Sequence, residues 1–489
     1  MVSKTPSNKT SEKSILDYSW VEWIFYTMVL IIPLIVYLKI IPVPAQYMGY
    51  WINNNVFDFF SYYKAKTLII LSTPLFLAMI YLAFLQANRK AILAYFKNDT
   101  LISFVSLYIT FILISTAFSD YIDIALYGFF ERSEGMWVLL AYCVIFLVLY
   151  FKKINYQFYY VLLGFLALSA FFISLIGFFQ FLGVDFFNSS FGKSLILPSQ
   201  YGFLADKLTF PLTNFYSTLY NGNNLSHFMA TLLPMFLVLF TLNRSNASWF
   251  FLLIGIICCV GLIVSNGRGG WMAALSVITF FTLIVLIKKD RDQIKKIVFI
   301  TLIFTVIFGT LGITSNGAIL KRAESIFIIK SANKSDFYSS YRHLFSGRVG
   351  MWLNSLPLSK ETIVIGYGPD TFAFYYPNPP SKPKRKRAFV DKPHNIYIQS
   401  LINIGGLGLI SFLGIVGVFF YRSYRYLAVK GIGDEGGVLV LALSLGVLGY
   451  LLAGMFYDST LHVAPIFWIL LGVGAALTRS IIPSEAAIK

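Results

Sequence analysis

Long apolar runs recur along almost the whole chain, separated by short polar stretches. Each run approaches the roughly 20 residues that an α-helix needs to cross a bilayer. The pattern predicts an all-α integral membrane protein, a single polytopic domain over residues 1–489. We expect about twelve transmembrane helices, near residues 22–40, 67–88, 100–118, 136–151, 159–183, 225–242, 248–265, 269–287, 295–313, 397–421, 437–457 and 463–480.

The composition agrees with a membrane protein. Of the 489 residues, 57% are hydrophobic and 12% are charged, with a mean hydropathy of +0.71, whereas soluble proteins carry about 25% charged residues. Cys143, Cys258 and Cys259 all lie inside apolar runs, so we expect buried thiols and no disulfide. The first apolar run has no small-residue cleavage site, which favours a retained first helix over a removed signal peptide.

The basic residues of the short loops predict the orientation. With the N-terminus in the cytoplasm, "ANRKAILAYFKND" and "KKDRDQIKK" lie inside, and the acidic "SDYIDIALYGFFERSEG" lies outside. The positive-inside rule then places both termini in the cytoplasm. Two longer segments, 184–224 and 314–394, become external. The second holds thirteen Lys and Arg against five Asp and Glu, a surface that attracts anions such as pyrophosphate or an anionic glycan, unless it is simply a solvated loop.

An arginine flanked by glycines joins two predicted spans on the external side, in "SNGRGGW" at 265–271. Gly267, Gly269 and Gly270 would let the chain turn sharply and let a ligand approach the backbone. Free N–H groups at the start of the next helix, together with the Arg268 guanidinium, would form an anion site. The alternative is an arginine that reaches to the interface and fixes the depth of its helix.

A second cluster lies in the large external loop, in "YRHLFSGRVGMWLNSL" at 341–356. Arg342, His343 and Arg348 are its polar candidates. The apolar spacing places Arg348 at the head of a short amphipathic helix. On that helix Trp352 fits a packing or interfacial anchor better than a sugar platform. The compact turn "IGYGPDTF" at 365–372 follows, and turn chemistry alone accounts for it.

A third cluster opens the tenth predicted span, in "DKPHNIYIQSLINIGGLGLI" at 391–410. Pro393 disfavours helix before it, so His394 and Asn395 lie at the external mouth of the span. His394 is the best candidate for a proton acceptor near neutral pH, although a hydrogen-bonded structural histidine is the alternative. Gln399 lies one turn beyond Asn395 and would face the same way.

The sequence carries no metal-binding motif, and we expect no metal and no cofactor. Asp120, Asp123, Glu131 and Glu134 share one external loop, but their spacing is unspecific. The basic run at 382–387 suits anionic lipid headgroups or solvent better than nucleic acid. Ionisable residues gather at external helix ends and not at mid-membrane, which favours an interfacial enzyme over a proton-coupled transporter.

These clusters, in this order, resemble the O-antigen ligase and O-antigen polymerase superfamily of bacterial membrane glycosyltransferases. The matching pieces are "ERSEGMWVLLAY", "NGNNLSHFMATLLP", "SNGRGGW", "SGRVGMW", "IGYGPDTF" and "PHNIYIQSLINIGGLG". The resemblance implies a GT-C-type fold with a large, partly helical external loop between spans nine and ten. It also implies a multi-pass enzyme of the bacterial plasma (inner) membrane with its active site on the periplasmic face.

The resemblance further implies a reaction and its residues. A glycan would pass from undecaprenyl pyrophosphate to an acceptor hydroxyl, on a lipid A-core type sugar or another cell-surface acceptor, with inversion and without metal. Arg268 and Arg348 would hold the pyrophosphate, and His394 would orient or deprotonate the hydroxyl. The other expected binding residues are Arg342, His343, Asn395, Gln399, Asn223, Asn224 and Arg132.

Three other functions are also compatible with the sequence. A polymerase would extend undecaprenyl-linked chains with the same donor chemistry. A transporter or flippase for lipid-linked oligosaccharides would also carry many spans and basic external loops. A structural scaffold of an envelope complex would need neither Arg268 nor His394.

Overall fold

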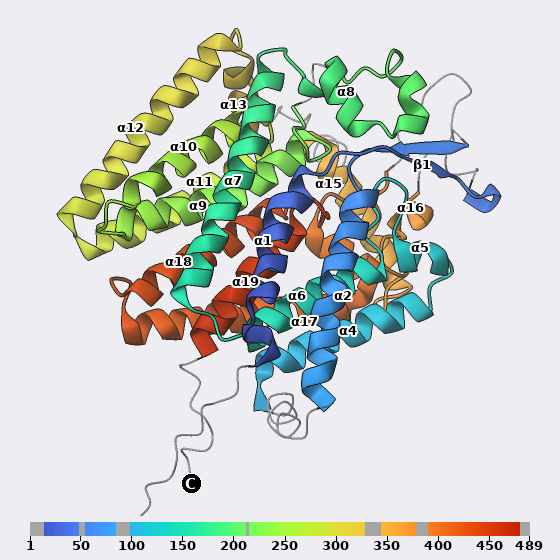
Figure 1. The fold of residues 1–489 in the computed structure, drawn as a ribbon, viewed down its shortest axis with the longest axis horizontal. Helices are drawn as coiled ribbons and strands as arrows, with labels where there is room; N and C mark the ends of the chain where they lie inside the picture. Colours follow the sequence, from blue (N-terminus) through green and yellow to red (C-terminus); the bar gives the residue numbers. More distant parts are fainter. Residues whose placement is uncertain are drawn as a thin grey trace, which may run out of the picture.

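The computed structural model describes residues 14–47, 54–84, 98–211, 215–327, 344–377 and 390–479. Helices dominate, and Figure 1 shows them packed against one another in one bundle. Most of the buried apolar side chains form one core cluster. The longer ones are α1 (Ser19–Leu34), α2 (Tyr62–Phe84), α4 (Thr100–Ala117), α6 (Met136–Phe151), α7 (Tyr156–Phe181), α9 (Gly222–Leu242), α10 (Ser248–Val264), α11 (Arg268–Lys288), α12 (Arg291–Thr314), α13 (Ala318–Phe327), α15 (Leu344–Ser355), α17 (Ile396–Lys430), α18 (Glu435–Ala453) and α19 (Ala464–Thr478).

Eight of these helices are long and apolar enough to cross a membrane: α2, α4, α7, α9, α11, α12, α17 and α18. The other four predicted spans coincide with the shorter apolar helices α1, α6, α10 and α19, of 15 to 17 residues. A mostly helical fold with several candidate membrane-spanning helices is therefore confirmed, as expected for a multi-pass membrane protein. The count of twelve and the GT-C-type architecture stay predictions.

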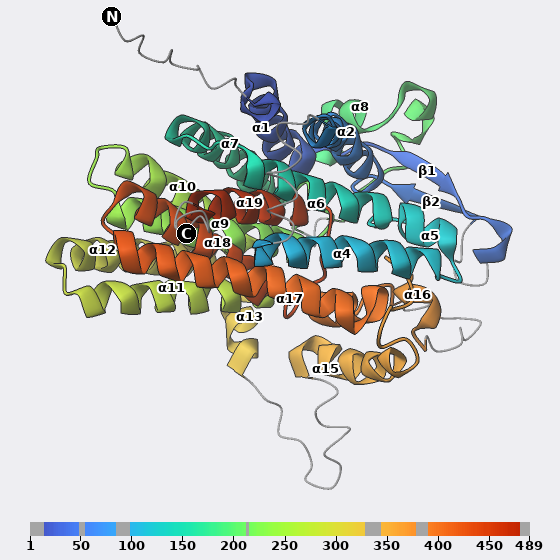
Figure 2. The same ribbon diagram turned by 90° about the horizontal axis from the view of Figure 1, so that it is seen from below.

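Burial separates the inner helices from the outer ones. The most apolar window of α9 is 100% buried and that of α18 is 89% buried, whereas that of α12 is only 17% buried. Figure 2 shows the helices side by side, with α9 and α18 inside and α12 at the edge. A helix that is apolar on all sides suits either position, because lipid and protein interior are both apolar.

The break in α17 shows what its glycines do. Gly405 has a φ of 85° and interrupts the helix. A Cβ atom there would lie 2.3 Å from the carbonyl oxygen of Val364, and the N–H of Gly406 donates to the carbonyl of Ile363 at 2.5 Å. Gly405 and Gly406 thus admit the backbone of the loop that precedes the 365–372 turn.

A small antiparallel sheet departs from the all-α expectation. Strands β1 (Lys39–Pro42) and β2 (Asn55–Asp58) pair with Lys39 opposite Asp58. Asp58 accepts hydrogen bonds from the N–H groups of Phe60, Ser61 and Tyr62 at 2.7 to 2.9 Å and so starts α2. Each strand has four residues. This is too short for an alternation of apolar and polar residues to be recognised in the sequence between long apolar helices.

The two long segments between spans form separate features. In 184–224 lie α8 (Ser190–Ile196) and two short 3-10 helices, Phe186–Asn188 and Ser199–Leu204. In 314–394 lie α13, α15, the 3-10 helix Leu356–Lys360 and α16 (Phe372–Tyr375). Figure 2 shows α8, both strands, α5 (Ile122–Tyr127) and α16 gathered at one end of the bundle, with α13 and α15 along one face.

Candidate active site

The turn before α11 is built around Tyr457. Its left-handed residue is Asn266, with a φ of 55°, while Gly267 has a φ of −88°. The N–H of Gly270 donates to the hydroxyl of Tyr457 at 2.9 Å. A Cβ atom on Gly269 would lie 2.9 Å from Cζ of Tyr457. The expectation that these glycines expose free N–H groups to a ligand is therefore wrong at Gly270, because Tyr457 uses that space and that donor.

Arg268 begins α11 and extends toward α13. Its Nη1 donates to the side-chain oxygen of Ser325 at 3.0 Å. Arg322, also on α13, donates from Nε to the carbonyl of Asn266 at 3.2 Å. The first helix of the large loop thus folds back over the turn and brings a second arginine beside Arg268. The two guanidinium groups repel each other.

Arg348 lies within α15 rather than at its head, because the helix begins four residues earlier at Leu344. Its Cζ lies 5.4 Å from the centroid of the Tyr457 ring, within the range of a cation–π contact. Its Nε is buried and has no hydrogen-bond partner among the described residues. Burial and the charge of Arg322 lower the pKa of Arg348, so an anion bound here would relieve an unfavourable positive charge.

His394 forms a short hydrogen bond with Asp458. The distance from Nδ1 to Oδ2 is 2.6 Å, and His394 adopts a left-handed φ of 52°. The negative charge of Asp458 raises the pKa of His394. Burial acts to raise the pKa of Asp458, but His394 lowers it to about 2. Since Asp458 is then ionised, Nδ1 carries the proton of the neutral imidazole, and the lone pair of Nε2 remains for an external hydroxyl.

Neighbouring side chains hold the backbone of His394 in place. The indole N–H of Trp352 donates to the carbonyl of Pro393 at 3.0 Å. Asn395 caps α17 by accepting hydrogen bonds from the N–H groups of Tyr397 and Ile398, at 2.9 and 3.1 Å, and its Nδ2 donates to Met455 at 3.0 Å. Trp352 is thus an anchor, as expected. The amide of Asn395 is engaged with the backbone, a capping role that we did not predict for it.

Basic and acidic side chains pair closely on the other side of His394. Lys392 Nζ lies 2.7 Å from Glu134 and 3.5 Å from Asp370. Burial opposes its charge, yet Asp370 and Glu134 raise the pKa of Lys392 overall. Arg132 forms an ion pair with Asp391. The Glu134 carboxylate, a weak metal candidate by sequence, is therefore neutralised by a lysine.

The remaining predicted binding residues are mostly engaged within the protein. Gln399 accepts a hydrogen bond from the N–H of Ser459 at 2.8 Å. The side chain of Asn224 is buried, donates to Leu219 at 2.8 Å and lies 3.3 Å from Nδ1 of His462. The neighbouring Asn223 is half-buried. Gln399 and Asn224 thus have structural partners, and their proposed contact with a substrate stays a prediction.

The site converges on Tyr457 and Asp458, in the segment between α18 and α19. The Arg268 turn donates to the hydroxyl of Tyr457, Arg348 covers its ring, and His394 binds Asp458. We predicted neither residue of this pair. The available signal in the sequence was an acidic residue next to the end of a predicted helix. The sequence does not show which residues such an acid will contact. Arg342 and His343 lie outside the described residues.

The described residues hold no group of three or more His, Cys, Asp or Glu side chains that could bind a metal ion. Asp120 and Asp123 instead accept hydrogen bonds from Tyr375 and Tyr47, at 2.9 and 2.5 Å. The site itself offers arginines for an anion and a carboxylate-bound histidine for a proton.

This arrangement agrees with a comparison of the sequence with known families. Residues 253–413 match the family model for O-antigen ligases. The matched region contains Arg268, Arg348 and His394 and leaves out the Tyr457–Asp458 segment. No curated protein matches the chain. The match supports an O-antigen ligase-like role and a membrane glycosyltransferase, for which a lipid-linked glycan and a lipid bilayer are the implied partners.

Proposed function

We propose that this O-antigen ligase-like protein transfers a glycan from undecaprenyl pyrophosphate to an acceptor hydroxyl at the outer face of the plasma membrane. The observation that carries the proposal is the junction at Tyr457 and Asp458, with arginines on one side and the His394–Asp458 pair on the other. Both termini would lie in the cytoplasm, and the bundle would be a GT-C-type domain of twelve spans. Segment 314–394 would carry part of the active site.

The proposed chemical step is a single displacement. The acceptor oxygen attacks the anomeric carbon as Nε2 of His394 takes its proton, and the bond from that carbon to the pyrophosphate oxygen breaks. Undecaprenyl pyrophosphate leaves with the electron pair, and the configuration at the anomeric carbon inverts. Asp458 orients the imidazole and stabilises the charge that it gains, which makes Asp458 a positioning residue.

Arg268 and Arg348 would stabilise the leaving group. Pyrophosphate gains negative charge as the glycosidic bond breaks, and fixed guanidinium groups in a partly buried site stabilise that charge without reorganisation. Burial of Arg348 and its proximity to Arg322 leave positive charge in excess here. The arginines would therefore supply what a divalent cation supplies in other transferases.

A reconstituted assay tests the proposal. Purified protein, an undecaprenyl-pyrophosphate glycan and a glycolipid acceptor should yield product, with the rate changed less than about two-fold by a chelator because the arginines neutralise the donor. Loss of activity with chelator and recovery with magnesium would refute the two-arginine mechanism. The variant His394→Ala should lose about 10²–10⁴-fold in kcat, and full activity in this variant would remove its role as base.

The product separates the ligase from the alternative, an O-antigen or polysaccharide polymerase. A ligase attaches one glycan to a different lipid acceptor, so electrophoresis shows a single shift. A polymerase extends undecaprenyl-linked chains and gives a ladder. A protein that moves the donor across liposomes but transfers no glycan is a transporter.

A further inference from the structure

A pocket of about 290 Å³ lies at the external end of the bundle, away from the arginines. Its walls come from β1, α2, α5 and the start of α6, whereas Arg268 and Arg348 belong to α11 and α15. The helices α2 and α6 both begin at this level. The pocket therefore lies at the first turns of two apolar helices, and in the proposed orientation this level is the external surface of the membrane.

Two lysines place positive charge at this pocket. Lys66 lines it directly, and its Nζ lies 5.7 Å from the centroid of the Tyr62 ring. Lys39 of β1 approaches the same ring at 5.1 Å. Throughout the described chain, neither ammonium group has an ion-pair or hydrogen-bond partner. The acidic lining residue, Asp123, already accepts a hydrogen bond from Tyr47.

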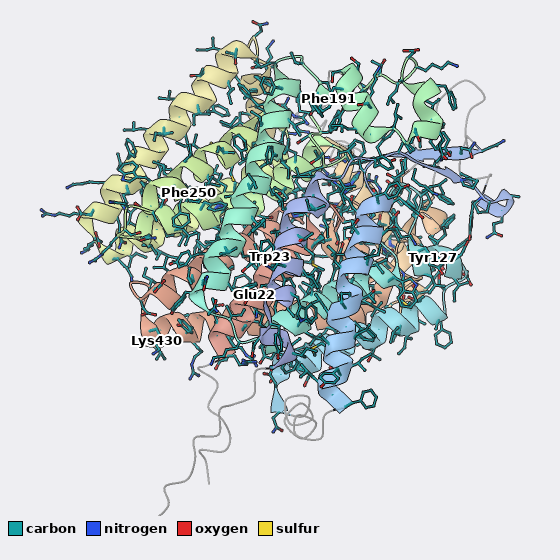
Figure 3. All side chains as sticks on the ribbon, in the orientation of Figure 1. Glu22, Trp23, Tyr127, Phe191, Phe250 and Lys430 are labelled. Carbon is teal, nitrogen blue, oxygen red and sulfur yellow. The ribbon has the colours of Figure 1, made fainter. Side chains whose placement is uncertain are left out.

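The rest of the lining is aromatic or aliphatic and partly open. Trp137 is 45% exposed and Tyr127 is 63% exposed, and Figure 3 labels Tyr127 at the outer edge of the molecule. Ile69 continues the apolar wall along α2 toward the membrane. Exposed Trp and Tyr at helix ends are typical of the headgroup region, because their side chains are amphipathic.

We propose that this pocket binds the phosphate of a membrane lipid. Lys66 and Lys39 hold the phosphate beside Tyr62, and the hydrocarbon follows Ile69 and Trp137 into the bilayer. Unpaired cations next to exposed aromatic rings match the charge and shape of an anionic headgroup. A zwitterionic headgroup binds more weakly, because its own cation repels the two ammonium groups. The site is distinct from the donor site and needs no glycan transfer, so it can be tested without donor.

Native mass spectrometry of the delipidated full chain tests the proposal. Titration with phosphatidylglycerol should give a first binding event at least about five-fold tighter than titration with phosphatidylcholine of the same chain length. The variant K39A/K66A should lose this preference, and Lys66→Arg should keep it because the charge remains. The matched control Lys207→Ala removes an exposed lysine of the external segment outside the pocket and should change nothing. Equal binding of both lipids, or a preference unchanged in K39A/K66A, overturns the proposal.

A second titration identifies the source of the phosphate. The probe is a diphosphorylated glucosamine disaccharide lipid, compared with phosphatidylglycerol on wild type and K39A/K66A. Tighter, lysine-dependent binding of the disaccharide lipid supports the site and assigns it to a glycolipid, such as an acceptor. Equal, lysine-dependent binding also supports the site and assigns it to bulk anionic lipid. Lysine-independent binding of both overturns it.

Discussion

The two ends of the helical bundle differ in whether their basic side chains have partners within the protein. At the end away from the site, the protein supplies a partner for each of four cations. Arg422 binds Asp99 at 2.6 Å, and Lys152 lies 3.1 Å from Glu22. Arg479 donates to the carbonyl of Tyr150 at 2.8 Å, and Lys296 donates to that of Phe240 at 2.9 Å. These cations hold helix ends together.

At the site end the cations divide into two groups. Arg132 and Lys392 are paired with carboxylates, like Arg422 and Lys152 of the opposite end. Arg322 and Arg348 form no ion pair with any described residue, and they lie close enough to repel each other. Close to the site, the unbalanced charge therefore lies on the side next to Arg268, whereas Lys39 and Lys66 belong to the separate pocket between α2 and α6.

The contrast separates structural cations from candidate functional ones. A cation that has a partner within the fold stabilises the fold. Its removal leaves a buried anion or carbonyl without a partner. A cation that the fold leaves unbalanced costs stability, and a bound anion offsets that cost. The same substitution should therefore have opposite effects at the two ends.

The largest effects are expected for two single variants, Arg348→Ala at the site end and Arg422→Ala at the opposite end. The first should lower the rate of glycan transfer by about 10²–10³-fold, because it removes a donor to the developing charge. It should leave the thermal midpoint unchanged or higher, since repulsion from Arg322 is relieved. The second should lower the free energy of unfolding by about 3 kcal/mol, because Asp99 is left buried without its partner. Transfer assays and thermal unfolding in the same detergent check both.

Two results would break the comparison. One is a large loss of stability in Arg348→Ala, which would make this arginine structural. The other is a stable Arg422→Ala whose transfer rate falls as far as that of Arg348→Ala. The charge-keeping variant Arg348→Lys should recover part of the rate, because lysine keeps the charge but lacks the fork of donors.

A smaller effect, about 10²-fold in kcat, is expected for Asp458→Asn, because the amide does not stabilise the charged imidazole. The sign of its pH dependence follows from the charge of Asp458. That charge raises the pKa of His394, and a base works only when deprotonated, so activity in the wild type should rise with pH through a pKa above the usual 6.5. In Asp458→Asn the acidic limb should move to lower pH.

The matched control for this prediction is Asp99→Asn, which removes the carboxylate that pairs with a cation at the other end. It should lower stability and leave the acidic limb of the rate profile in place. An Asp458→Asn profile that coincides with that of the wild type would exclude Asp458 as the partner that sets the pKa of His394.

The sequence predicts the helices better than the site. Apolar runs are local, and the twelve predicted ranges all coincide with helices, eight of them long enough to span. Arg268, Arg348 and His394 were also predictable as candidates, since only 12% of the residues are charged and each of these three lies beside a predicted helix boundary. Their convergence was not, because it depends on contacts between residues 64 to 187 positions apart in the chain.

The glycines of the Arg268 turn illustrate the limit. In the sequence, these glycines indicate either an unusual backbone conformation or the close approach of another group to the backbone. The sequence does not show which group that is. The structure assigns the close approach to Tyr457 and to Ser226, whose Oγ would lie 2.1 Å from a Cβ atom on Gly267. The left-handed conformation belongs to Asn266 instead. A tyrosine almost 190 positions later leaves no trace in the local pattern.

The smallest effect is expected for Trp352→Phe, which tests whether the hydrogen bond from Trp352 to Pro393 helps to position His394. The variant keeps the ring against Phe456, 6.4 Å away between centroids, but removes the indole N–H that donates to Pro393. One hydrogen bond of this kind contributes about 1 kcal/mol, so kcat should fall by about five-fold while KM for the donor stays within about two-fold. Single-turnover rates and donor titrations separate the two. A change in KM alone would mean that Trp352 contacts substrate and does not position His394.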